Sequence, residues 1–139
     1  ETNFNVMNSV FDALLALIKG NKRISKGAAA EIIAGATLKL ADVKSKNVAA
    51  SCLTELAETA VGNCFVIDHV MKHASGHRNP KVIQESLAWM SECIHDFGCF
   101  ELDIRGIIQF CESAYTNTNP HVRTNATALL VILRRYVGP

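Results

Sequence analysis

The fold is decided by a stretch whose pattern returns further along the chain, NPKVIQESLAWMSECIHDFG at residues 79–98. Residues 119–138 also open on Asn-Pro and close on glycine, so both landmarks recur after 40 residues, from 79 to 119 and from 98 to 138. Gly62 and Gly20 extend the series of glycines toward the N-terminus. Each of these glycines ends an apolar stretch with helical spacing. The chain is therefore built from a repeated unit.

The period and the helical spacing together indicate a fold class. A repeat of about 40 residues with two helices in each unit is typical of HEAT and armadillo arrays. We therefore expect an all-α fold, a HEAT-repeat α-solenoid of antiparallel helix pairs. About three and a half units fit the chain, with boundaries at 1–42, 43–78, 79–118 and 119–139. Such arrays stack helices into an elongated surface that binds other proteins, and they rarely catalyse reactions.

Seven helices are predicted from the three- and four-residue spacing of apolar side chains. Their expected ranges are about 3–18, 25–40, 47–61, 65–74, 80–97, 103–115 and 120 onward. Ser25 and Asn79 suit the N-cap position, and Pro80 suits the first helical position because its missing N–H costs nothing there. From the second helix onward, the side chains expected to face inward are Ala28, Ile32, Ala36 and Leu40; Ala49, Leu53, Leu56 and Ala60; Val66, Val70 and His73; Ile83, Leu87, Met90, Ile94 and Phe97; Ile104, Ile107, Ile108 and Cys111; and Val122, Ala126, Leu129 and Leu133.

The turns between these helices fall into two groups. Turns inside a helix pair are Lys19–Ile24, Gly62–Cys64, Gly98–Leu102 and Gly138–Pro139. Turns between pairs are Ala41–Lys46, Ser75–Asn79 and Thr116–Asn119. Stacking places each group along one long side of the array. We call the first side the intra-unit edge and the second the inter-unit edge.

Composition bounds the class of partner. The 139 residues suit one domain, and 49% apolar with 19% charged residues provides for a packed core. The net charge of +1 gives no strong attraction to nucleic acid or to membranes, and no run reaches the ~18 apolar residues that cross a bilayer. We expect a monomeric module with a protein partner, no nucleic acid and no membrane. The chain opens at Glu1 and stops one helix into its last unit, so we expect a piece of a longer protein.

Catalytic and metal-binding chemistry is not indicated. The five cysteines are an odd number and fall mainly in predicted helices, which favours reduced thiols over a disulfide framework. His69 and His73 are four residues apart, but no tight Cys-x-x-Cys pair accompanies them, so no metal is expected. The carboxylates occupy outward helical positions, and no phosphate loop or nucleophile elbow is present. We expect no enzyme and no cofactor.

Several short motifs, in their order and spacing, resemble one family. They are Thr2-Asn3-Phe4, Lys19-Gly20-Asn21, Leu40-Ala41-Asp42-Val43-Lys44, Asn79-Pro80-Lys81, Phe97-Gly98, Thr118-Asn119-Pro120 and Tyr136-Val137-Gly138-Pro139. Together they resemble a TOG domain of the microtubule polymerase family that includes mini spindles and ch-TOG. The chain is most similar to a third TOG module, and it covers the third to sixth of the six HEAT repeats such a domain has.

The resemblance implies that the chain binds αβ-tubulin and microtubules through the intra-unit edge. It also implies a cytoplasmic, cytoskeletal location on microtubules, the spindle and the centrosome. Two of the implied contact turns lack the positive charge expected of them, because turn 62–64 has no basic residue and turn 98–102 carries Glu101. More of the binding is therefore expected from residues 19–23. The candidate tubulin-binding residues are Lys19, Asn21, Lys22, Arg23, Asn63, Phe100 and Arg105.

Other interpretations remain open. The cations at 19–23 could be a solvated helix end, where the helix dipole alone favours positive charge. The inter-unit edge is also basic, so charge by itself does not choose the binding edge; its cations are Lys44, Lys46, His77, Arg78 and Lys81. The chain could instead be a HEAT scaffold for a different protein, or an architectural spacer between active TOG modules. Trp89, Met90 and Phe97 are expected in the core, and Arg123 is expected to bond within the inter-unit turns.

Overall fold

The computed structural model describes residue 16 and residues 25–58, 62–98 and 102–137. These ranges contain six helices and no strand: α2 (Lys26–Lys39), α3 (Lys46–Ala57), α4 (Gly62–Ala74), α5 (Pro80–Phe97), α6 (Ile104–Tyr115) and α7 (Pro120–Val137). The all-α prediction is confirmed. Of the helix expected at 3–18, only Ala16 lies within the described residues, and it is helical. No described helix is both long and apolar enough to span a membrane.

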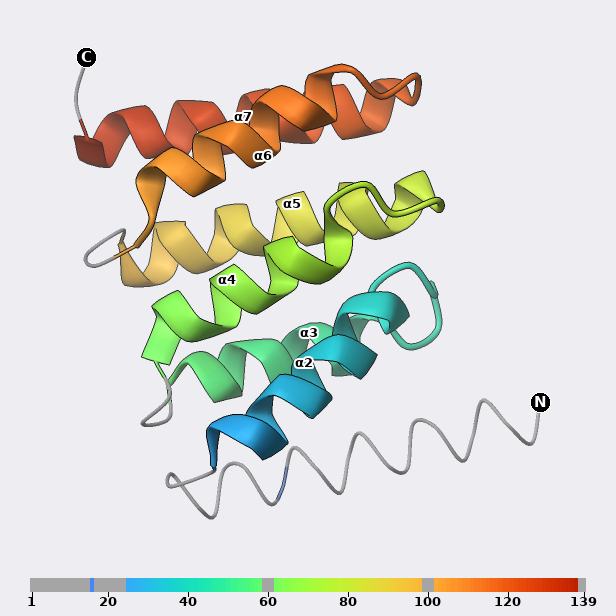
Figure 1. The fold of residues 1–139 in the computed structure, drawn as a ribbon, viewed down its shortest axis with the longest axis vertical. Coiled ribbons are helices and arrows are strands. Elements are labelled where there is room, and N and C mark those ends of the chain that lie inside the picture. The colour runs from blue at the N-terminus through green and yellow to red at the C-terminus, as the bar shows by residue number, and fades with distance from the viewer. Residues whose placement is uncertain (1–15, 17–24, 59–61, 99–101, 138–139) are drawn as a thin grey trace.

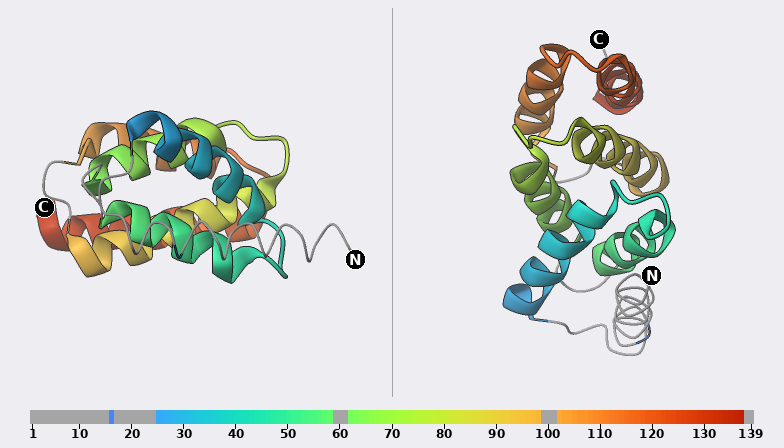
Figure 2. Two further views of the ribbon diagram at one scale, coloured as in Figure 1. Left: turned by 90° about the horizontal axis from the view of Figure 1, so that it is seen from below. Right: turned by 90° about the vertical axis from the view of Figure 1, so that its right-hand side faces the viewer.

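The helices form two layers (Figures 1 and 2). One layer contains α2, α4 and α6, and the other contains α3, α5 and α7. Successive helices run in opposite directions, and α3 packs against α4 while α6 packs against α7. The helix α5 packs against α7, α4 and α2, which makes it the centre of the described array.

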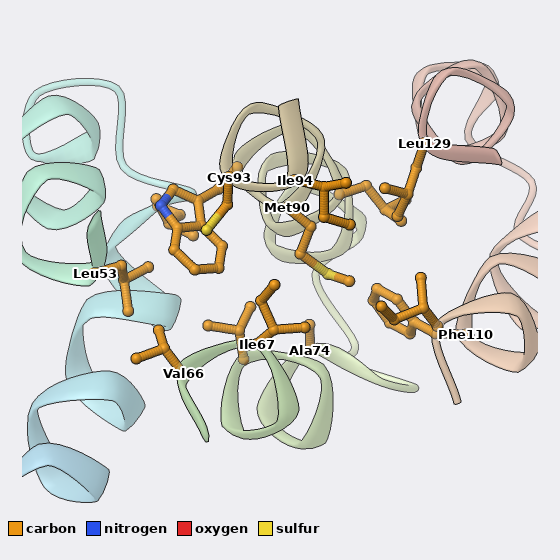
Figure 3. Packing of buried hydrophobic residues seen from close by; sticks show 14 of the residues in the cluster. Leu53, Val66, Ile67, Ala74, Met90, Cys93, Ile94, Phe110 and Leu129 are labelled. Carbon is orange, nitrogen blue, oxygen red and sulfur yellow. The ribbon is translucent and has the colours of Figure 1, made fainter. Parts of the chain in front are cut away.

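A single core fills the space between the two layers (Figure 3). Leu53 of α3, Ile67 of α4, Met90 of α5 and Leu129 of α7 are all fully buried within it. Phe110 of α6 closes the same cluster and is 6% exposed. Every unit therefore contributes side chains to a core that it cannot complete alone.

Local signals in the sequence set the helix boundaries. The Ser25 hydroxyl accepts a hydrogen bond from the Ala28 N–H at 3.1 Å, and the Asn79 carboxamide oxygen accepts one from the Lys81 N–H at 3.0 Å. Pro80 is the first residue of α5. Gly98 ends α5 with φ of 77°, a conformation that glycine adopts without a steric penalty. The predicted caps Ser25 and Asn79, and the predicted ends of α5, are confirmed.

Three of the predicted inward stripes agree closely with the observed burial. All four positions of α7 are buried, and so are the three described positions of α3; Ala60 lies outside the described residues. In α5 the prediction holds except at its last position, because Phe97 is 41% exposed. Phe97 stands at the very end of its helix, beyond the cover of the neighbouring helices. Trp89 and Met90 are confirmed as core residues.

The stripe predicted for α2 is confirmed at Ala36 and Leu40, which are buried, but it is wrong in the first half of the helix. Ala28 is exposed and Ile32 only half-buried, whereas Ala29 and Ile33 are fully buried. The helix sequence KGAAAEIIAGATLK is apolar or small around most of its circumference, so its spacing does not select a face. In α6 the predicted positions Ile107 and Cys111 are buried, but Ile108 is 40% exposed and Phe110 is buried instead. His73 of α4, which was expected inward, is half-buried.

In addition to this packing, polar contacts join helices of successive units. The Lys46 ammonium of α3 lies 3.4 Å from the Glu85 carboxylate of α5. The Trp89 indole N–H donates to the Thr54 hydroxyl at 3.2 Å, again joining α5 to α3. The Asn125 amide of α7 donates to the Gln84 carbonyl at 2.9 Å. All three contacts use α5, so its position fixes both of its neighbours in the layer.

Candidate partner-binding edge

The helix ends lie along two opposite sides of the array (Figure 1). The last turns of α3, α5 and α7 and the first turns of α4 and α6 meet on one side, which is the intra-unit edge. The turns that follow α2, α4 and α6 meet on the other side, which is the inter-unit edge. The predicted separation of the turns into two edges is confirmed for the described residues.

Two of the seven candidate contact residues lie within the described part of the chain. Lys19, Asn21, Lys22, Arg23 and Phe100 lie outside it. Asn63 and Arg105 are described, and each belongs to the first turn of a helix that starts at the intra-unit edge. The structure therefore brings these two to the expected side of the molecule.

Asn63 stands in a helix rather than in the turn predicted at 62–64. The helix α4 begins at Gly62, whose φ of 83° reverses the chain just before it. The Asn63 carboxamide oxygen accepts a hydrogen bond from the Cys93 thiol of α5 at 2.8 Å, and the residue is half-buried. This correction gives Asn63 a packing role between α4 and α5. Short-range turn signals miss it because Cys93 is 30 residues away.

Arg105 is exposed one residue after the start of α6. Asp103 caps this helix by accepting the Gly106 N–H at 3.0 Å. The N-terminus of a helix carries partial positive charge, so a cation there does not stabilise the helix. The placement of Arg105 is therefore not explained by the stability of α6, and its exposed guanidinium is available to a partner.

The C-terminal turns of α5 and α7 contribute residues that the sequence did not single out. Tyr136 of α7 is 48% exposed, and its hydroxyl donates to the His95 carbonyl of α5 at 3.1 Å. A Cβ atom on Gly98 would lie 4.0 Å from the Tyr136 ring, so the ring stands beside the end of α5. With Phe97 exposed as well, the edge presents two aromatic side chains. The one signal in the sequence that could have indicated these residues was that the two 20-residue repeats end in the same way.

A hollow of about 370 Å³ lies between α5 and α7. It is lined by Ser91, Glu92, His95, Asp96 and Ile132. Its lining mixes carboxylates, an imidazole and one aliphatic side chain without a convergent pair of catalytic groups. The hollow is a surface depression.

The cysteines of this region are protonated thiols. Burial, and to a smaller extent the charge of Asp96, raises the pKa of Cys93 to about 12. Burial and then the charge of Glu112 raise the pKa of Cys111 to about 12. Burial and Asp68 also raise the pKa of Cys64, whose thiol donates to Asp68 at 3.6 Å. A thiol must ionise to attack an electrophile or bind a metal well, so these side chains serve packing.

The described residues contain no group of three or more histidine, cysteine, aspartate or glutamate side chains that could hold a metal ion. The Nδ1 atom of His69 donates to the Phe65 carbonyl, 3.0 Å away, and the His69 ring stacks on the Phe65 ring. Burial, followed by the charges of Lys72 and His69, lowers the pKa of His73. The two histidines thus take part in the local packing of α4.

Taken together, the two-layer helical stack and its turn-lined edges define a HEAT-repeat module of the kind that binds other proteins. The family model for the XMAP215/Dis1/CLASP TOG domain matches residues 1–139. The chain belongs to this TOG-domain family, and the resemblance predicted from its motifs is confirmed.

Relatives and a solved structure agree with this assignment. Protein MOR1 of Arabidopsis thaliana is 33% identical over 140 residues, covering 100% of this chain and 7% of its own length. The protein mini spindles of Drosophila melanogaster is 29% identical over 138 residues. The solved TOG3 structure of Drosophila Mini spindles matches with a TM-score of 0.90 and 28% identity, covering 99% of this chain and 60% of that one. The chain spans about 7% of the length of the curated relatives it matches.

Proposed function

We propose that the chain is an αβ-tubulin-binding TOG module of a microtubule polymerase or plus-end regulator. Membership of the XMAP215/Dis1/CLASP TOG-domain family is the observation that carries this proposal. The close match to TOG3 of Mini spindles supports it at the level of the fold. The module acts by binding and not by catalysis, in the cytoplasm on microtubules, the spindle and the centrosome.

The intra-unit edge is the proposed contact surface. Its described helix ends are held by the Asp103 cap, by Gly98 at the end of α5 and by the Tyr136 bond to the His95 carbonyl, so these helix ends form a preformed part of the surface. A preformed surface loses little conformational freedom on binding, which favours affinity. The proposed contact residues remain Lys19, Asn21, Lys22, Arg23, Asn63, Phe100 and Arg105. We add Phe97 and Tyr136, because both side chains are exposed at this edge.

The proposed contact residues would have different roles, according to the chemistry of their side chains. Tubulin is an acidic partner, so Lys19, Lys22, Arg23 and Arg105 would supply attraction that weakens with salt. Exposed aromatic residues supply apolar contact area at the centre of many protein interfaces. Asn63, whose side chain oxygen is engaged by Cys93, would act mainly by placing the first turn of α4. We also propose that the chain comprises three and a half HEAT units, at 1–42, 43–78, 79–118 and 119–139.

A single module would bind one partner without polymerising anything. Several modules in one polypeptide raise the local concentration of the bound protein, because the second binding event becomes intramolecular. The chain spans about 7% of its curated relatives, which leaves room for further modules in proteins of that length. We therefore place the growth-promoting activity in the whole protein and the binding event in this chain.

The proposal is tested by co-elution of the chain with αβ-tubulin on a sizing column at low and at high salt. The wild type is compared with Lys22→Glu/Arg23→Glu. The matched control is Arg78→Glu/Lys81→Glu, which makes the same change of charge on the inter-unit edge. We expect a complex at low salt that the first variant and high salt abolish and that the control retains.

The alternatives give different results in the same experiment. A HEAT scaffold for another protein, or an architectural spacer between active modules, gives no complex with tubulin at any salt concentration. Equal loss in both double variants would mean that binding follows net charge and not the intra-unit edge. Either result would remove the proposed contact surface.

A further inference from the structure

One side of α5 carries a row of carboxylates, at Glu85, Glu92 and Asp96. Glu85 lies 3.4 Å from the Lys46 ammonium, so its charge is compensated. Among the described residues, Glu92 has no hydrogen bond and no ion pair, and Asp96 has only the ring of the neighbouring His95, at 3.4 Å. The two carboxylates nearer the end of α5 therefore keep their negative charge at the surface, where both residues are exposed.

The charges of Glu92 and Asp96 do not stabilise α5. Side chains four residues apart are neighbours on a helix, and like charges at that spacing destabilise it. Asp96 also stands in the last turn, where the partial negative charge of the helix end disfavours a carboxylate. Within the described ranges, the exposed Arg134 and Arg135 of α7 form no ion pair with either carboxylate. The described fold gives no reason for this pair of charges, whereas a bound cation would.

The hollow between α5 and α7 lies beside the pair. Glu92, His95 and Asp96 border it together with Ser91 and Ile132, and most of its exposed lining is apolar. Its volume of about 370 Å³ compares with about 30 Å³ for one water molecule, so it has room for a long side chain. No group of acidic, histidine and cysteine side chains in the described part of the chain converges closely enough to hold a metal ion. The hollow therefore suits a cation that is carried at the end of an apolar stem.

We propose that the hollow between α5 and α7 binds a lysine or arginine side chain of a basic partner polypeptide. Both side chains pack an apolar stem on apolar surface and keep a charged head in water. The stem would pack against Ile132, and the head would lie by the carboxylates of Glu92 and Asp96. Nucleic acids and anionic lipid surfaces would be repelled by the same carboxylates.

A second hollow extends the proposed contact to the other side of α5. It has a volume of about 260 Å³, is bordered by Glu92, and includes Ala88 and Trp89 in its lining. The ion pair of Lys46 and Glu85 at its rim leaves it without net charge. Packed helices lie about 8–10 Å apart, so furrows on the two sides of one helix are separated by about that distance. An extended segment that crosses α5 covers it in about three residues and would place an uncharged side chain in this second hollow.

A titration followed by NMR of the chain's backbone amides tests the proposal at low salt. The probe is a serine–glycine peptide with one lysine and, three residues later, one leucine. A second peptide carries acetyl-lysine, which keeps the stem and loses the charge. We expect amides of the C-terminal half of α5 and of α7 near Ile132 to shift, with about fivefold weaker affinity for the acetylated peptide.

The variant Glu92→Gln/Asp96→Asn should also bind the lysine peptide about fivefold more weakly. The matched control is Glu31→Gln/Glu112→Gln, which removes the same charge from two exposed residues in the layer of α2, α4 and α6. The control should change the affinity less than twofold. Equal losses in the two variants would mean that binding follows net charge, and would remove the hollow as a specific site.

Stability separates a binding role of the two carboxylates from a structural one. Because their repulsion destabilises α5, Glu92→Gln/Asp96→Asn should unfold at the same or at a higher urea concentration than the wild type. Weaker binding by a variant that is at least as stable supports the proposal. A variant that unfolds at lower urea concentration would show that the carboxylates support the fold, and would overturn the proposal.

Other outcomes also overturn the proposal. Equal affinity for the two peptides, or shifts that avoid the hollow, would mean that no cation binds there. Dimerisation of the wild type that Glu92→Gln/Asp96→Asn abolishes would assign the hollow to a second copy of the chain. Tubulin co-elution of the same variant keeps the two proposals separate, because loss of negative charge does not weaken attraction to an acidic partner.

Discussion

At the scale of single residues, the potentially reactive side chains are buried and serve packing. The thiols of Cys93 and Cys111 are buried, and their raised pKa values keep them neutral at physiological pH. Cys93 also donates to Asn63, which holds α4 against α5. Trp89 is 4% exposed, with its N–H bonded to Thr54, so even its polar atom is used within the core. These residues stabilise the array and leave binding to the edges.

The buried thiols predict how stability depends on pH. In the unfolded chain a thiol ionises near its ordinary pKa of 9.0, but in the folded chain Cys93 and Cys111 ionise only near 12. Between these values the folded state binds more protons than the unfolded state, so stability is present below pH 9 and falls as the pH rises. Each thiol contributes a slope of up to about 1.4 kcal/mol per pH unit.

Urea unfolding between pH 8 and pH 10.5 measures this effect. The control is Cys93→Ala/Cys111→Ala, which removes both groups and should show a shallower decline above pH 9. Parallel declines in the two proteins would contradict the assignment of the slope to these thiols. The comparison is made within the pair because lysine and tyrosine residues also titrate in this range.

At the scale of elements, the turn that ends α5 depends on one glycine. Gly98 has φ of 77°, where a residue with a Cβ atom pays about 1–2 kcal/mol. Gly98→Ala should lower the free energy of unfolding by about that amount, although the nearest atom, in the Tyr136 ring, leaves room for the methyl group. The measurement is urea denaturation monitored by circular dichroism.

Gly35→Ala is the matched control for this substitution. Gly35 lies in the interior of α2, is exposed, and has no heavy atom within 4 Å of an added Cβ. Alanine is the better helix former, so this change should raise stability by about 0.5–1 kcal/mol. Changes of the same sign at the two glycines would show that backbone conformation does not govern the cost at Gly98.

Elements with a strong local pattern could be predicted from the sequence. The caps of α5, its glycine end and the buried stripe of α7 follow from nearest-neighbour chemistry and a clear amphipathic spacing. The buried positions in the first half of α2, Ala29 and Ile33, did not follow, because a helix that is apolar around most of its circumference gives no clear preference until its neighbours are known. The first turn of α4 was missed because the contact that holds Asn63 comes from Cys93, far along the chain.

The candidate site was predictable in outline only. Alternation of two kinds of turn places them on opposite edges in any stacked array of helix pairs, and the structure confirms this separation. Phe97 was predicted in the core because it continues the apolar spacing of its helix, and Tyr136 was named only within a motif of the family resemblance. Their exposure depends on where the neighbouring helices stop, which is a tertiary property.

At the scale of the whole molecule, α5 connects the array. It packs against α7, α4 and α2, and it receives the Lys46, Thr54 and Asn125 contacts described above. In a solenoid each unit is stabilised by its neighbours, so the helix with neighbours on both sides opens least often. The stability of this protein should therefore be highest at α5 and decline toward α7.

Hydrogen–deuterium exchange with mass spectrometry tests this gradient. Amides in peptides from the middle of α5 should exchange at least about tenfold more slowly than those from the C-terminal half of α7. The Asn125→Ala variant, which loses the bond to the Gln84 carbonyl, should accelerate exchange in α7 while leaving α3 unchanged. Equal protection of α5 and α7 in the wild type would mean that the array opens as a single cooperative unit.

The burial of Trp89 has a practical consequence for studying the array. It is the one tryptophan among the 139 residues, and it lies midway along α5 with its indole bonded to α3. Its fluorescence emission therefore reports whether two neighbouring units are in contact, and not the overall helix content. Emission shifted to shorter wavelength marks a closed interface, and a shift to longer wavelength marks separation of the units. A sensor of inter-unit contact is thus built into the wild-type chain.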